Sequence, residues 1–181
     1  IPERLLNLPY GNFVAVKAPM FSFMRLDKAD PILGVEMAST GEVAVLGEDL
    51  PDALLKALEA AEQNIPIQGG NVLISVAGEE LKKKVIPIAK KLKKMGFTLF
   101  ATEDTAEALK NNEIYSVRLY KVHEYGKEPN IIACLQNGAI DMVINIPLPT
   151  SQEEKFRQII KDDYTIRRMA IDYNIPVIIN L

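Results

Sequence analysis

Beyond residue 70, short and nearly continuous apolar runs alternate with longer amphipathic stretches. Strands that are apolar at almost every position are typical of a parallel sheet covered by helices on both faces. Alternating strand and helix units of this length predict an α/β domain with a doubly wound, five-stranded parallel sheet. The predicted strands are 71–77, 97–101, 116–122, 141–146 and 176–181, and the predicted helices are 80–95, 103–110, 130–136 and an interrupted helix at 152–173.

The chain before this region follows a different pattern. β-branched residues predict strands at 13–17 and 41–46. Asp49 and Pro51 mark the start of a helix, one as its cap and the other in its first turn. Two strands and one helix make a thin core for a separate domain, so this α+β segment is expected to be the end of a larger one.

The segment 65–70 contains proline and paired glycines, which interrupt both the helical and the strand pattern. We therefore expect one domain boundary here, between residues 1–70 and residues 71–181. The chain opens on Ile1 rather than on methionine, which favours a fragment of a longer protein.

Composition disfavours several classes of function. A net charge of -3 provides no general positive field for nucleic acid. The single cysteine excludes an internal disulfide framework and is compatible with the cytoplasm. The single histidine also disfavours a zinc site. No apolar run approaches the ~20 residues that span a bilayer. We expect Cys134 to be a small buried hydrophobe and His123 to make a local hydrogen bond.

Polar side chains follow the predicted strands at the edge of the sheet where ligands of doubly wound folds bind. Thr102 and Thr105 stand where one strand turns into a helix, and Lys121 follows the neighbouring strand. Exposed N–H groups at such a turn favour a phosphate or a carboxylate. The alternative is that Thr102 caps the helix while Glu103 and Asp104 complement its dipole.

Ordered motifs along nearly the whole chain carry a family resemblance. They are KAPMFSF at 17–23, DPILG at 30–34, EMASTGEV at 36–43, GFTLFATEDTA at 96–106, DMVIN at 141–145, IRRMA at 166–170 and IPV at 175–177. The first three resemble the end of the second ATP-grasp unit of carbamoyl-phosphate synthetase large subunits. The others resemble the methylglyoxal-synthase-like regulatory domain that follows it.

The resemblance implies a regulatory module of an ATP-dependent ligase. The parent enzymes make carbamoyl phosphate from ATP, bicarbonate and glutamine-derived ammonia, and use ATP with Mg or Mn. The residues that hold metal-bound ATP in that family precede this chain, so it is expected to have no catalytic residues, metal site or cofactor of its own. The implied partners are the rest of the large subunit, a glutaminase small subunit and, through homo-oligomer contacts, further copies of the chain.

The family's effector pocket also implies roles for individual residues. In nucleotide-regulated members the matching side chains surround the phosphate of UMP or IMP. Lysines neutralise a phosphate, while hydroxyls and an amide donate to its oxygens. The effector-binding residues implied in this way are Lys82, Thr102, Thr105, Lys121 and Asn145.

Departures from the family pattern bear on the identity of the ligand. Asp104 replaces a glycine found in many bacterial members and would repel a phosphate, and Ile146 and Pro147 replace hydroxyl residues. The ATEDT motif and the segment 162–168 are more similar to the animal urea-cycle enzyme, which binds N-acetylglutamate. Lys121 and Leu148, however, differ from the tryptophan and asparagine of that enzyme. UMP or IMP is favoured, with N-acetylglutamate as the alternative.

Arg168 is a further candidate contact for an anion, because methylglyoxal synthases have a phosphate-binding arginine at the matching place. The alternative is that Arg167 and Arg168 form exposed ion pairs with nearby acids, which are individually weak. The acids within reach are Asp162, Asp163 and Asp172.

The alternative function is that of a methylglyoxal synthase, a lyase that acts on dihydroxyacetone phosphate. That reaction needs a carboxylate base beside the phosphate. The family supplies it from a Gly-Asp-Gln segment, which is lacking at 128–132. Asp104 is a substitute candidate, but a capping place at the start of a helix explains it better.

Overall fold

The computed structural model describes residues 11–22, 32, 39–124, 126–146 and 157–180. These residues fall into two units, and the chain from residue 65 onward belongs to the larger one. Pro147, Leu148 and the predicted helical residues 152–156 lie outside the described residues.

The smaller unit is an antiparallel strand pair with a helix against it. Asp49 accepts a hydrogen bond from the Asp52 N–H at 2.9 Å, which confirms its role as the helix cap. A Cβ atom on Gly47 would lie 2.4 Å from the Ala53 nitrogen, so the close contact of helix and strand requires glycine there. The elements are β1 (Val14–Met20), β2 (Gly41–Gly47) and α2 (Leu50–Ala60).

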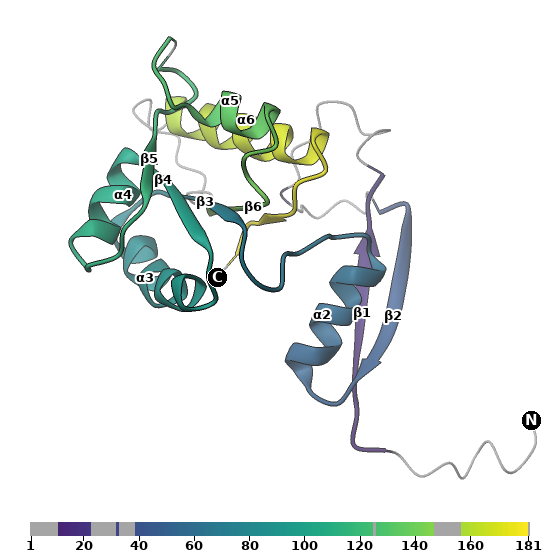
Figure 1. Ribbon diagram of the computed structural model, residues 1–181. Coiled ribbons are helices and arrows are strands. Elements are labelled where there is room, and N and C mark those ends of the chain that lie inside the picture. The colour runs from purple at the N-terminus through teal and green to yellow at the C-terminus, as the bar shows by residue number, and fades with distance from the viewer. Residues whose placement is uncertain (1–10, 23–31, 33–38, 125, 147–156, 181) are drawn as a thin grey trace, which may run out of the picture. The chain divides into compact units, whose positions relative to one another are not determined.

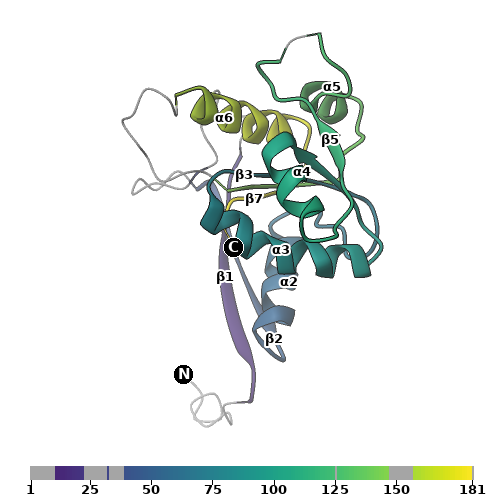
Figure 2. The same cartoon turned by 90° about the vertical axis from the view of Figure 1, so that its left-hand side faces the viewer.

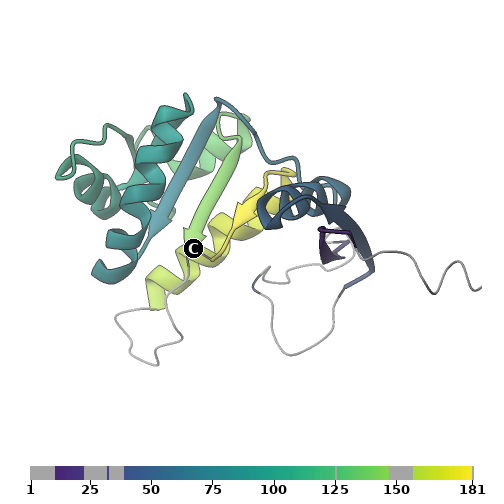
Figure 3. The same cartoon turned by 90° about the horizontal axis from the view of Figure 1, so that it is seen from below.

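The larger unit contains the predicted five-stranded parallel sheet, in the order β5-β4-β3-β6-β7. Figure 3 shows the central strands β3 and β6 side by side. The strands are β3 (Asn71–Val76), β4 (Thr98–Thr102), β5 (Val117–Leu119), β6 (Met142–Ile146) and β7 (Val177–Ile178), and the helices are α3 (Glu79–Lys94), α4 (Glu103–Lys110), α5 (Ile131–Gln136) and α6 (Arg157–Asp172).

Helices cover both faces of this sheet. Figure 1 shows α5 and α6 on one side of the sheet and α3 on the other, and Figure 2 shows the same layers after a quarter turn. Val72 and Ile74 of β3 pack in the core beneath α3 and α4, whereas Leu73 packs in the core beneath α5 and α6. Alternate residues of one strand therefore pack into two different cores. This explains why the predicted strands are apolar at almost every position.

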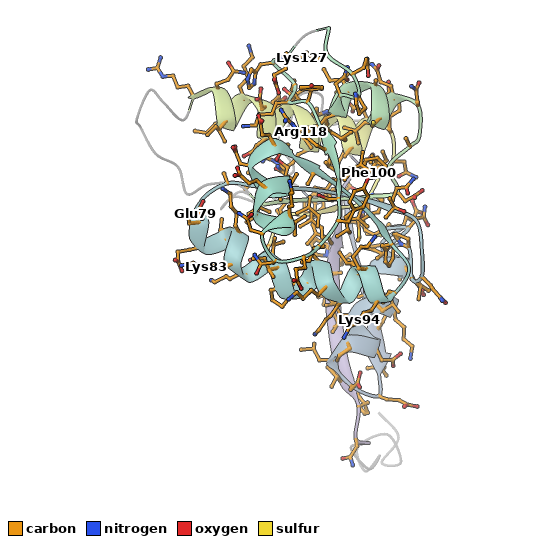
Figure 4. All side chains as sticks on the ribbon, turned by 60° about the vertical axis from the view of Figure 1, so that its left-hand side comes forward. Glu79, Lys83, Lys94, Phe100, Arg118 and Lys127 are labelled. Atoms are coloured by element: carbon orange, nitrogen blue, oxygen red, sulfur yellow. The ribbon has the colours of Figure 1, made fainter. Side chains whose placement is uncertain are left out.

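The outer surface of α3 carries a lysine-rich stretch. Figure 4 shows Glu79 and Lys83 near the start of the helix and Lys94 at its end, and all three side chains are exposed. Acidic residues in the first turn and lysines in the last turn complement the helix dipole. Lys82 differs from the other lysines, because only 15% of its side chain is exposed.

Some predicted boundaries were wrong at the sheet edges. The third predicted strand is shorter, because the N–H of Tyr120 donates to the Pro129 carbonyl and thus pairs with a loop. The last strand contains only Val177 and Ile178. The last helix was predicted at 152–173 with an interruption, and within its described residues α6 is continuous from Arg157 to Asp172.

Candidate anion-binding site

The strand order reverses beside β3. The chain continues from β3 to β4 on one side, and later returns to place β6 on the other. In doubly wound sheets, the crevice outside the carboxyl ends of the strands at such a reversal is the usual ligand site. The residues at these ends are Val76 of β3, Thr102 of β4 and Ile146 of β6.

Two buried threonines join the end of β3 to the start of α4. The Thr105 hydroxyl donates to the Val76 carbonyl at 3.2 Å and accepts from the Val76 N–H at 3.3 Å. The Thr102 hydroxyl donates to Thr105 at 3.3 Å. Thr102 occupies the cap position, and Glu103 and Asp104 lie in the first turn, as the capping alternative predicted, but the Thr102 side chain makes no capping bond. Its hydroxyl faces Thr105 instead.

Lys121 reaches the same turn from the loop after β5. Its Nζ donates to the Asp104 carboxylate at 2.9 Å. This hydrogen bond holds the pKa of Asp104 below its usual value, against the opposing effect of burial, and the charges of Lys121, Lys82 and Arg118 lower it further. Lys82 itself pairs with Glu79 at 2.9 Å. Several cations therefore surround one carboxylate at the start of α4.

Asn145 lies at the centre of a buried polar network. Its side chain is fully buried, and its amide donates to Asp163 at 2.8 Å and to the Ser75 carbonyl at 3.3 Å. Arg167, which is 1% exposed, donates to the Asn145 side-chain oxygen at 2.8 Å. The three side chains connect α6 to the end of β6. The lone pairs and amide hydrogens of Asn145 are thus used mainly within the protein.

Sequence reasoning missed this network. The alternative placed Arg167 and Asp163 in exposed ion pairs, and the exposure was wrong, because both residues are buried. The helical spacing of the residues in α6 indicates which polar side chains are buried. Asp163 and Arg167 are spaced like Ile166 and Ala170, which are buried, and this places all four on the face of α6 that meets the sheet.

The remaining candidates have local partners. Arg168 donates to Asp172 at 2.6 Å, which confirms the ion pair of the alternative, although only 15% of the Arg168 side chain is exposed. His123 hydrogen-bonds to Asp162, as expected. Cys134 is half-buried rather than fully buried, and burial raises the pKa of its thiol.

Asp163 has an unusual electrostatic environment. Burial raises the pKa of its carboxyl and outweighs the hydrogen bond from Asn145 and the attraction of Arg167 and Lys121. A carboxyl whose pKa is higher in the folded state binds its proton more tightly when folded. Its contribution to stability is therefore complete below the unfolded pKa, near 3.8, and is lost as the pH rises through the folded pKa.

Replacing Asp163 by asparagine removes this titration while keeping an acceptor for the Asn145 amide. We expect the free energy of unfolding of Asp163→Asn, minus that of the wild type, to increase as the pH rises from about 4 to 7. Urea unfolding at several pH values measures this difference. A difference that is constant or that decreases with pH would contradict the assignment.

A groove of about 770 Å³ lies elsewhere, between α4 and the outer strand β5. Its lining includes Glu103, Tyr115 and Arg118, and it contains none of the effector-binding residues implied by the resemblance. Glu103 and Arg118 pair there at 2.7 Å.

The described residues contain no group of three or more histidine, cysteine and acidic side chains arranged to hold a metal ion. None of the helices in this part of the chain is both long and apolar enough to cross a membrane.

The structure thus brings Thr102, Thr105 and Lys121 together at the start of α4, with the charge of Lys82 acting on the same turn. Asn145 connects to this group through Asp163, whose carboxyl is influenced by Lys121. Arg168 makes a separate pair on α6.

Comparison with known proteins identifies the class. The model of the MGS-like domain family matches residues 84–179, so the chain belongs to this family. It is 42% identical over 179 residues, 97% of its length, to Multifunctional protein pyr-3 of Neurospora crassa. It is 40% identical over 173 residues, 94% of its length, to "Carbamoyl-phosphate synthase (ammonia), mitochondrial" of Homo sapiens. It is also 40% identical over 187 residues to Multifunctional protein URA2 of Saccharomyces cerevisiae.

Within the family, the chain corresponds to the MGS-like part of carbamoyl-phosphate synthase large subunits and of the related multifunctional proteins. It covers 10% of the Neurospora crassa protein, 11% of the human protein and 8% of the yeast protein. The chain therefore spans about a tenth of the length of these relatives.

Proposed function

We propose that the chain is the C-terminal regulatory region of a carbamoyl-phosphate synthase large subunit and that it binds a small anionic effector. Residues 71–181 form the effector-binding domain in this proposal, and residues 1–70 are the end of an ATP-grasp domain. One observation carries it: the Lys121 ammonium bonds to Asp104 in the first turn of α4, and the hydrogen-bonded hydroxyls of Thr102 and Thr105 lie at the same turn, where the strand order reverses.

The residues divide into ligand contacts and supports. Lys121 and Lys82 supply positive charge, and Thr102 supplies a hydroxyl whose present partner is another hydroxyl. The first N–H groups of α4 add donors for an anion. Thr105 and Asn145 are already bonded within the protein, and we assign them the role of holding the ends of β3 and β6 in place.

UMP or IMP is the favoured ligand, because a phosphate uses two ammonium groups and a hydroxyl more fully than a carboxylate does. N-acetylglutamate is the alternative. The proposal includes the rest of the large subunit and a glutaminase small subunit as partners, ATP with Mg or Mn as the parent enzyme's requirement, and a location in the cytoplasm.

Calorimetric titration with UMP, IMP and N-acetylglutamate tests the proposal. We expect one of them to bind, and Lys121→Ala and Thr102→Ala each to weaken that binding by about 10- to 100-fold, because each removes a hydrogen bond to a charged group. Lys83→Ala is the control, because Lys83 is exposed on α3 and pairs with Glu80.

Two results would contradict the proposal. One is the absence of binding for all three ligands, or binding that Lys121→Ala and Thr102→Ala leave unchanged. The other is turnover of dihydroxyacetone phosphate, which would assign the chain to the methylglyoxal synthases instead.

A further inference from the structure

We propose that Asp104 is an internal competitor of the ligand: its carboxylate occupies Lys121 in the free protein, and an anion must displace it to bind. This inference rests on the proposed function and adds to it a residue that limits the affinity of the site. It predicts that neutralising Asp104 strengthens the binding of anions.

The contacts of Lys121 define the competition. Its ammonium is 2.9 Å from the Asp104 carboxylate, and 29% of its side chain is exposed. Asp104 is within the electrostatic reach of Lys121, Lys82 and Arg118, so it lies among the cations that an anionic ligand would use. A ligand anion and Asp104 therefore require the same ammonium group.

The cost to the ligand has two parts. The first is the loss of the charge-assisted hydrogen bond between Lys121 and Asp104, whose strength is moderated by solvent because 59% of the Asp104 side chain is exposed. The second is the repulsion between the ligand and the carboxylate that has lost its partner. The first part applies only to a ligand that takes the Lys121 ammonium, and the second part grows with the negative charge of the ligand. Neither part applies to an uncharged ligand that leaves Lys121 paired with Asp104.

The adjacent residue, Glu103, provides a matched comparison. It is also in the first turn of α4, and it is similarly exposed, at 49% against 59% for Asp104. Its partner is Arg118, at 2.7 Å, in the groove between α4 and β5. Asp104 and Glu103 thus make equal contributions to the helix dipole, but only Asp104 engages the proposed ligand-binding lysine.

Isothermal titration calorimetry of the whole chain with UMP, in wild type, Asp104→Asn and Glu103→Gln, tests the inference. We expect Asp104→Asn to bind UMP at least about tenfold more tightly than the wild type, because a charged partner of Lys121 is removed. Glu103→Gln should match the wild type. Uridine, which lacks the phosphate, should show no gain with Asp104→Asn.

Carboxyl NMR provides a second readout. The Asp104 signal is assigned as the one that Asp104→Asn removes. When UMP saturates the wild type, the pKa of Asp104 should rise, because its bond from Lys121 is lost. If the wild type binds UMP and the pKa of Asp104 does not rise on saturation, the inference is wrong.

The outcomes separate the two proposals. If the wild type binds UMP and Asp104→Asn binds it no more tightly, the internal competitor is wrong while the proposed function stands. If neither protein binds UMP, IMP or N-acetylglutamate, both proposals are wrong.

Discussion

Replacing Arg167 by methionine is expected to lower the free energy of unfolding by about 3–5 kcal/mol. Arg167 is 1% exposed, donates to Asn145 at 2.8 Å, and attracts the buried Asp163 carboxylate. Methionine fills a similar volume but leaves Asp163 without its cation and Asn145 without a donor. Truncating one member of a buried charged group is costly for this reason.

Urea unfolding followed by circular dichroism measures the loss. Arg118→Met is the control, because Arg118 pairs with Glu103 at the surface, where 47% and 49% of the two side chains are exposed. The control should lose less than about 1 kcal/mol, as is usual for exposed pairs. Equal losses for the two variants would show that the buried network does not contribute more than a surface pair.

Replacing Phe97 by alanine is expected to cost about 3–5 kcal/mol, mainly through the cavity that it leaves. Phe97 is 2% exposed and packs in the core beneath α3 and α4. It stands just before β4, while Thr102 is the last residue of that strand. Five residues of strand separate the two by about 16 Å. The binding site should therefore keep its geometry in the folded variant.

This substitution separates stability from binding. Urea unfolding should show the loss, and calorimetry at a temperature where Phe97→Ala is folded should show wild-type affinity for the ligand. A folded Phe97→Ala protein that no longer binds the ligand would contradict the assigned position of the site. A loss below about 1 kcal/mol would contradict the packing argument.

The central features of the fold could be predicted from the sequence, because they depend on local pattern. The runs around Ile74 and Ile144 are apolar at nearly every position, and this pattern indicates a parallel sheet buried on both faces. The sheet edges were less predictable. Tyr120 is as suitable for a strand as its neighbours, and only its bond to the Pro129 carbonyl ends β5.

The candidate site was predictable only in part. The strand-to-helix turn indicated Thr102 and Thr105 as a pair, and the structure joins them by a hydrogen bond. Capping preference alone could not reveal that the Thr102 hydroxyl would bond to the Thr105 side chain instead of to a backbone N–H of the helix. Asp104 and Lys121 are 17 residues apart, and their contact depends on the pairing of β4 with β5. Such tertiary contacts are not encoded in local spacing.

Lys121 has one more consequence for communication across the domain. Its ammonium bonds to α4, beneath one face of the sheet, and its charge also acts on Asp163 of α6, which covers the other. A molecule that captures this single side chain thus changes the electrostatic balance of both helical layers at once. Under the proposed function, an anion bound to Lys121 would therefore act on the helices of both faces of the sheet.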